Sequence, residues 1–241
     1  YLYVLKAKSD QIAIIDTRDN RMKQTATITV EDVSEIQEMY LDIERNQLIA
    51  VCDGYVGGKW NDDDYGYGQR ANTTAVTYDI SDRENPKEVG RVSQSGYYNS
   101  SRIADGYLYL FSDYYVTLDG ITAKNPKSYI PLVNDNLIKE TDICLPSISK
   151  ADMYSIITSV SLENPNETAH SKALLADGGN LYVSNDNIYF YENVWQYSGK
   201  DVTTIRKVSY ESGELTAGAQ CKIDGYINDS FSIDEYDGYL R

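Results

Sequence analysis

The sequence is poor in histidine and cysteine. A single histidine, His170, excludes a site built on several histidine ligands and any catalytic arrangement of two histidines. We expect His170, which lies in a polar run, to be an ordinary exposed strand residue. The three cysteines lie far apart in the sequence and lack the spacing of a zinc site. Their odd number is not that of a disulfide framework, although one pair could be bonded, and we expect Cys52 and Cys221 to be small core residues.

Basic residues and long apolar runs are also scarce. The 241 residues include 22 lysines and arginines against 37 aspartates and glutamates, a formal net charge of −15. Binding to phosphates needs clustered basic side chains, so the composition argues against nucleic acid and anionic membrane surfaces as partners. No apolar run is long enough to insert into a membrane. The P-loop, the GxSxG elbow and the dinucleotide fingerprint are absent, and we expect no cofactor.

Tyrosine, by contrast, is abundant. The chain has 23 tyrosines but only 3 phenylalanines and 2 tryptophans. Tyrosine suits half-buried strands and binding surfaces, because it has an apolar ring and a polar tip. Short runs that alternate apolar and polar residues, bounded by Gly, Asn and Asp, replace helical periodicity, as at residues 11–15, 74–78 and 106–110. The sequence therefore predicts an all-β protein.

A unit of four strands repeats along the chain. Each copy has two strands joined by a polar turn, a link that usually contains glycine, and two further strands joined by a tight Asp, Asn or Gly turn. The copies cover residues 11–51, 74–111, 155–191 and 203–241, with insertions near 53–73 and 116–152. The fourth strands begin near Leu48, Leu108, Ile188 and Leu240.

Such a repeat favours a β-propeller. A single four-stranded sheet of this size buries both faces only when it packs radially against copies of itself, whereas a β-sandwich needs no repeat. The chain starts at the second strand of one blade and holds about four blades' worth of four-stranded antiparallel sheet. We expect one propeller domain over residues 1–241, an arc of a larger ring and a fragment of a longer chain, rather than a self-closed ring. Residues expected to be buried between blades are Leu108, Leu110, Ile188 and Phe190.

Several motifs follow one another in a fixed order. They are the Tyr-Asp-Ile-Ser-Asp to Asn-Pro-Lys stretch of residues 78–87, the Gly-Tyr pair 96–97, the Ser-Arg pair 101–102 and the late segment 234–241. In this order they resemble the secreted bacterial β-propeller family that is distantly related to WD repeats. The resemblance implies an extracellular or cell-envelope location, reached through a segment outside this chain. It implies no catalytic residues.

Loops on one face of the predicted propeller carry the candidate binding residues. Links from the second to the third strand of a blade and links between blades emerge on the same face, where loops on a rigid scaffold commonly bind ligands. The candidates are Trp60, Tyr65, Tyr67, Tyr97, Tyr98, Asn99, Arg102 and Tyr226. A solvated loop, a purely structural link and an arginine that binds carbonyls remain the alternatives. Asp62, Asp63 and Asp64 offer oxygen ligands to Ca²⁺ but lack the EF-hand pattern.

The sequence thus predicts a non-enzymatic extracellular binding or scaffold module, which presents its inserted loops to a peptide, protein or cell-wall glycan. A carbohydrate-active hydrolase would need a pair of carboxylates facing the channel, and it remains an alternative. A structural spacer of an envelope protein is the other. The apolar blade faces at the two ends of an arc also predict self-association, or closure of the first strands against the last.

Overall fold

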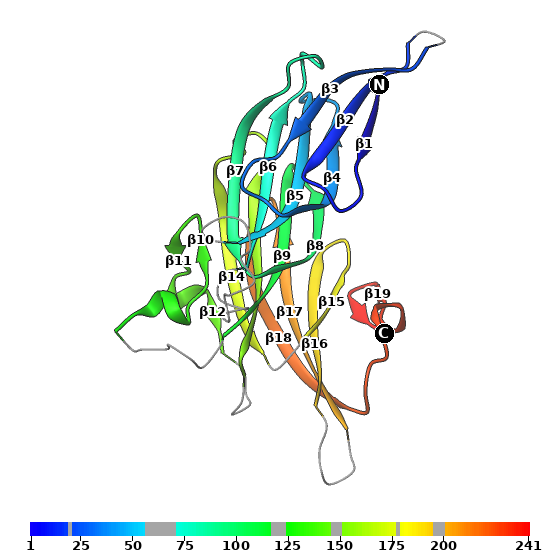
Figure 1. The fold of residues 1–241 in the computed structure, drawn as a ribbon. Helices are drawn as coiled ribbons and strands as arrows, with labels where there is room; N and C mark the ends of the chain where they lie inside the picture. The colour runs from blue at the N-terminus through cyan, green and yellow to red at the C-terminus, as the bar shows by residue number, and fades with distance from the viewer. Residues whose placement is uncertain (19–20, 56–70, 117–123, 146–150, 177–178, 195–200) are drawn as a thin grey trace.

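The computed structural model describes residues 1–241 except 19–20, 56–70, 117–123, 146–150, 177–178 and 195–200. Regular structure in the described residues is almost entirely β-strand, in sheets that succeed one another along the chain (Figure 1). The exceptions are three 3₁₀ turns: η1 (Pro126–Ser128), η2 (Glu140–Asp142) and η3 (Ser230–Ser232). The all-β prediction is confirmed.

Four sheets hold the main strands. The first contains β1 (Leu2–Leu5), β2 (Gln11–Asp16) and β3 (Lys23–Thr29). The second contains β4 (Glu35–Asp42), β5 (Gln47–Tyr55), β6 (Ala71–Asp79) and β7 (Lys87–Ser95). The third contains β8 (Tyr97–Ala104), β9 (Tyr107–Tyr115), β13 (Met153–Ser161) and β14 (Thr168–Ala176). The fourth contains β15 (Asn180–Val183), β16 (Asn187–Val194), β17 (Val202–Glu211) and β18 (Glu214–Asp224), and the pair β19 (Glu235–Tyr236) and β20 (Tyr239–Leu240) follows it.

These sheets have the strand order predicted for propeller blades. Within each sheet the main strands lie side by side in the order of the chain, and neighbouring strands are antiparallel. The three strands of the first sheet correspond to the second, third and fourth strands of the other sheets. The first sheet and the β19–β20 pair are not hydrogen-bonded to one another, and Figure 1 shows them apart, the first sheet at the upper right and the pair lower down on the right. The described sheets therefore form an open arc, without the closure of first strands against last that was the alternative. Self-association stays a prediction.

The central strands are buried on both faces, because their side chains alternate between two hydrophobic clusters. In β9, Tyr109 and Phe111 pack toward the fourth sheet, while the alternate residues Leu108 and Leu110 pack toward the second. The four residues predicted to lie between blades are all buried there: Leu108, Leu110, Ile188 and Phe190. Radial packing of neighbouring sheets thus supplies the second buried face that one sheet lacks.

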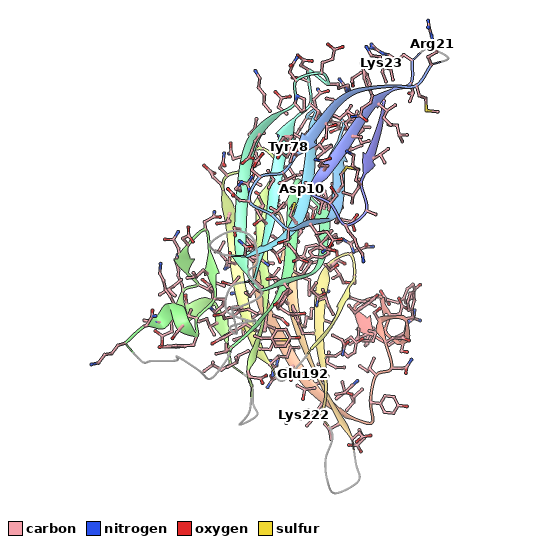
Figure 2. The ribbon with its side chains drawn as sticks, in the orientation of Figure 1. Asp10, Arg21, Lys23, Tyr78, Glu192 and Lys222 are labelled. Atoms are coloured by element: carbon pink, nitrogen blue, oxygen red, sulfur yellow. The ribbon has the colours of Figure 1, made fainter. Side chains whose placement is uncertain are left out.

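The core between the first two sheets contains Tyr78, labelled in Figure 2, together with Cys52. Burial raises the pKa of both the Tyr78 hydroxyl and the Cys52 thiol to about 12. The prediction for Cys52 is confirmed. The prediction for Cys221 is wrong, because β18 is the outermost strand of its sheet and Cys221 is exposed on it. All three cysteines are free thiols.

A buried ion pair lies within the fourth sheet, and its arginine also contacts the third sheet. Glu192 of β16, labelled in the lower half of Figure 2, lies 3.4 Å from the guanidinium of Arg206 on β17. Arg206 also donates to the carbonyl of Leu175 on β14 at 3.0 Å. This side chain therefore ties the fourth sheet to the outer strand of the third.

The insertion near residues 116–152 adds strands to the outer edges of two sheets. β10 (Leu132–Val133) and β11 (Asn136–Leu137) extend the second sheet beyond β7, and β12 (Ile143–Cys144) pairs parallel with β14. The sequence predicts a loop insertion here, whereas its described residues include short strands that pair with sheet edges. Added strands of this kind cover sheet edges that would otherwise expose main-chain groups.

The link from β7 to β8 requires glycine. Gly96 has a φ of +98°, and a Cβ there would lie 2.6 Å from the main-chain carbonyl carbon of Asp113. We expect Gly96→Ala to lower the free energy of unfolding by about 2 kcal/mol, because it combines left-handed strain with a backbone clash. The matched control is Gly225→Ala, since Gly225 has a φ of +96° but nothing within 4 Å of its Cβ position. Urea denaturation should show the smaller loss for the control, and equal losses would contradict the clash.

Candidate functional site

A repeated Asp or Asn holds the links between sheets. The position is the fifth residue after Leu48, Leu108 or Ile188. These residues lie near the start of the fourth strand of each sequence repeat, which is the second strand of a sheet in the structure. The position is filled by Asp53, Asp113 and Asn193. Each faces a hydroxyl residue on the next strand. The pairs are Asp53 with Thr73, Asp113 with Ser155, and Asn193 with Thr203.

The contacts of this residue are equivalent in the second and fourth sheets. Asp53 Oδ1 accepts the backbone N–H of Tyr98 at 2.7 Å, and Oδ2 accepts Gln37 Nε2 at 2.8 Å. Asn193 Oδ1 accepts the backbone N–H of Ile227 at 3.2 Å. Tyr98 and Ile227 each follow a Gly-Tyr link, so the residue in one sheet fixes the link that leads to the next.

The third sheet has a half-buried carboxyl at this position. Asp113 accepts Asn99 Nδ2 at 2.6 Å and Ser155 Oγ at 3.0 Å. Burial raises the pKa of Asp113 and of Asp53 above the usual range, and the hydrogen bonds oppose the shift. A raised pKa can indicate a functional acid. Recurrence at one position of three consecutive sheets indicates an architectural role here.

A hollow of about 900 Å³ lies on the inner side of the arc. Its walls are the start of β8, the whole of β15 and the segment that follows β18, and Figure 1 shows β15 beside that C-terminal segment. Amide, hydroxyl and aromatic groups line it together with aliphatic side chains. The first three kinds come from Asn99, Ser100, Asn180, Tyr182, Tyr191, Asn228, Ser230 and Phe231, and the aliphatic side chains are those of Leu181, Val183 and Ile233. The charged side chains in the lining are Asp229 and Asp234.

Both acids of the hollow are engaged locally. Asp229 Oδ1 caps η3 by accepting the backbone N–H groups of Phe231 at 3.0 Å and Ser232 at 3.1 Å. Asp234 forms an ion pair with Arg241. The cap presents Phe231 at the hollow with 97% of its surface exposed. Phe231 was not among the predicted binding residues. The sequence did contain a signal for it, because an aromatic residue between two serines after a capping Asp is typical of a short exposed turn.

Among the predicted residues, the structure brings Asn99 into the hollow. Tyr98 instead packs against the core between the second and third sheets, where its hydroxyl lies 3.0 Å from Ser101 Oγ and burial raises its pKa to about 12. Tyr97 is half-buried at the start of β8. Tyr226 is 66% exposed on the link after β18 and lies outside the lining.

The remaining candidates lie elsewhere. Arg102 donates to Asn185 Oδ1 at 3.2 Å, across to the β15–β16 turn of the next sheet. This contact fits the alternative in which Arg102 binds a nearby oxygen of the protein and has a structural role. Six candidates fall outside the described residues: Trp60, Tyr65, Tyr67, Asp62, Asp63 and Asp64.

His170 is not the ordinary exposed residue that was predicted. It lines a smaller hollow of about 280 Å³ between the β10–β11 hairpin and β14. Its Nε2 lies 3.2 Å from Asp142 Oδ1 and its Nδ1 lies 3.1 Å from Glu214 Oε2. These partners come from two other elements of the fold, which spacing in the sequence could not show. Among the described residues, no group of three or more His, Cys, Asp or Glu side chains is placed to hold a metal ion.

Antiparallel sheets that are buried on both faces and follow one another in an arc define a segment of a β-propeller. The family model described as "Beta propeller domain" matches residues 1–241, and the chain belongs to that family. In the part of the chain that the structure describes, no helix combines the length and apolarity needed to span a membrane.

A search of curated proteins found no match to this chain. Among solved structures, the chain is similar to Pyrococcus horikoshii acylaminoacyl peptidase, with 10% sequence identity and a TM-score of 0.40. The match covers 98% of this chain and 31% of the peptidase chain.

Proposed function

We propose that this propeller segment is a non-enzymatic binding module of the cell exterior or envelope, which binds a peptide, protein or glycan. The observation that carries the proposal is the hollow of about 900 Å³. It lies where the links from one sheet to the next meet the inner strands, because Asn99 follows such a link at the start of β8, Gly179 immediately precedes β15, and Asn228 belongs to the segment after β18. Loops gathered on one rim of a rigid scaffold are a common place for binding.

The lining supports binding of a polar ligand. Amide and hydroxyl groups can orient a sugar or a main chain, and aromatic rings supply contact area at low entropic cost. The acids give less support to a hydrolase, because Asp229 and Asp234 are already held by η3 and Arg241. A spacer would need no lined hollow. The family resemblance supports the location, and the net charge of −15 supports partners other than nucleic acid.

The test begins with arrays of immobilised peptides and cell-wall glycans, probed with the labelled protein. We expect Phe231→Ala to fold like the parent, because the ring is exposed, yet to lose about 2 kcal/mol of binding free energy for any ligand found. That loss corresponds to roughly thirtyfold in affinity. Isothermal calorimetry measures it.

Tyr239→Ala is the matched control. Tyr239 is 72% exposed on the same C-terminal segment, and it lies outside the lining of the hollow. This variant should bind like the parent. Undiminished binding by Phe231→Ala, or the absence of any ligand on both arrays, would count against the proposal.

A further inference from the structure

We infer that the hollow binds an extended basic peptide as an added strand on the free edge of β15; this rests on the proposed function and names its partner. In the described sheets β15 pairs only with β16, so its other edge carries no strand. Five consecutive residues, Gly179 to Val183, line the hollow. Side chains of successive strand residues point to opposite faces, so a continuous lining of this kind indicates that the main-chain edge itself borders the hollow.

The hydrogen-bond pattern shows which main-chain groups face the hollow. The N–H of Ser184 donates to the carbonyl of Asn187 at 2.9 Å, which makes these two a hydrogen-bonded pair at the turn. Antiparallel pairs alternate between hydrogen-bonded and non-bonded kinds. Val183 faces Ile188 in the next pair, and Leu181 follows two positions further on. The N–H and C=O groups of Val183 and Leu181 therefore point away from β16, toward the free edge.

The pairing on the other side of β16 agrees with this assignment. The N–H of Tyr210 donates to the carbonyl of Asp186 at 3.3 Å, and the same register places Ile188 opposite Val208, two positions along. Ile188 is therefore in a hydrogen-bonded pair with β17, and its main-chain groups point away from β15. Two residues of β15 thus offer two donors and two acceptors to a ligand, in the arrangement that an extended peptide satisfies.

Charge selects the class of peptide. Both charged side chains in the lining are acidic. Asp234 is paired with Arg241, so Asp229 and the net charge of −15 on the whole chain supply the negative field. A negative field raises the local concentration of a cationic ligand. The exposed ring of Phe231 and the ring of Tyr182 can pack against the stems of lysine or arginine side chains. A basic extended segment therefore matches both the edge and the charge of the hollow.

The probe is the capped ten-residue peptide (Lys-Thr)₅, with (Glu-Thr)₅ as the charge control, each titrated into the complete chain by calorimetry. We expect (Lys-Thr)₅ to bind at least ten times more tightly than (Glu-Thr)₅. N-methylation of one alternate set of its residues should abolish binding and N-methylation of the other set should leave it, because an added strand pairs through every second residue. Equal effects of the two sets would overturn strand addition.

Amide exchange in the protein gives a second readout. On binding of (Lys-Thr)₅ the amides of Leu181 and Val183 should become protected, while the amide of Tyr182, already paired with β16, should not change. Val183→Pro should weaken binding at least tenfold and Val183→Ala should not, because both remove the branched valine side chain but only proline removes the N–H that faces the hollow. Should the proline variant not fold, the exchange measurement on the parent decides.

The outcomes separate this inference from the proposed function. Binding of (Lys-Thr)₅ without protection at Leu181 and Val183 overturns the added strand and leaves a binding hollow. Failure of (Lys-Thr)₅ to bind, with glycan hits on the array that Phe231→Ala abolishes, overturns the peptide inference alone. Failure of the peptide and of both arrays overturns the two together.

Discussion

Replacement of Leu108 by aspartate should lower the free energy of unfolding by at least about 4 kcal/mol. Leu108 is 1% exposed in the core between the second and third sheets, so the change removes a buried apolar side chain and leaves an unpaired carboxylate there. Losses of this size belong to a few mechanisms, and an uncompensated buried charge is one of them. Urea denaturation followed by circular dichroism measures the loss.

Leu41→Asp is the matched control for this substitution. Leu41 lies on the inner strand β4 and is 41% exposed, so its carboxylate can stay hydrated. We expect this variant to lose no more than about 1 kcal/mol. Equal losses for the two variants, or a Leu108→Asp protein that unfolds with the parent, would show that adjacent sheets do not pack as described.

The sheets were predictable because their strands repeat one local pattern. Leu48, Leu108 and Ile188 each begin a strand after a tight turn, and the structure places all three in cores between sheets. The tight turns were equally predictable from their Asp, Asn and Gly residues. Asp105 and Gly106 have the positive φ angles that their turn needs, and Asp237 has the same conformation in the last hairpin.

Contacts that depend on tertiary placement were not predictable. Cys221 follows the same strand pattern as Cys52, but it lies on the outermost strand of its sheet and is exposed, whereas Cys52 is buried. A repeat in the sequence predicts the order of the strands, but it does not predict which strands are covered by another part of the chain. His170 shows the same limit, because its partners Asp142 and Glu214 belong to an insertion and to the next sheet.

The candidate site was predictable in position more than in composition. Link topology pointed to the rim where the hollow lies, and Asn99 was selected from it. The predicted aromatic residue was a different one, because Tyr98 packs against the core whereas Phe231, which was not predicted, is exposed at the hollow. Sequence cannot tell these two rings apart, since each follows a Gly-Tyr link within a polar run. Only the cap formed by Asp229 decides that Phe231 faces solvent.

The repeated Asp or Asn joins the links on the rim to the sheets below them. This side chain lies near the end of the second strand of a sheet, and in the second and fourth sheets it accepts a backbone N–H from the link that leads to the next sheet. The link is therefore held in place by the sheet before it. Loops next to this residue can then differ in length while the repeated Asp or Asn keeps the same position. The insertion after Tyr115 begins two residues beyond Asp113, close to such an anchor.

Replacement of Asp53 by alanine should therefore cost about 3 kcal/mol of unfolding free energy. The backbone N–H of Tyr98 would lose its acceptor in a half-buried position, and Gln37 would lose its partner. Asp53→Asn is the matched variant, because Asn193 fills the equivalent position of the fourth sheet and accepts the equivalent N–H. We expect Asp53→Asn to stay within about 1 kcal/mol of the parent at pH 7.

The two variants also differ in their response to pH. Burial raises the pKa of Asp53 in the folded state above its unfolded value, so the folded protein binds this proton more tightly. Stability from this group is present below the unfolded pKa of about 4 and declines as pH rises through the folded pKa. Asp53→Asn lacks that decline, so its stability relative to the parent should increase from pH 4 to pH 7. A constant difference across this range, or an Asp53→Ala variant as stable as Asp53→Asn, would show that the carboxyl does not anchor the link.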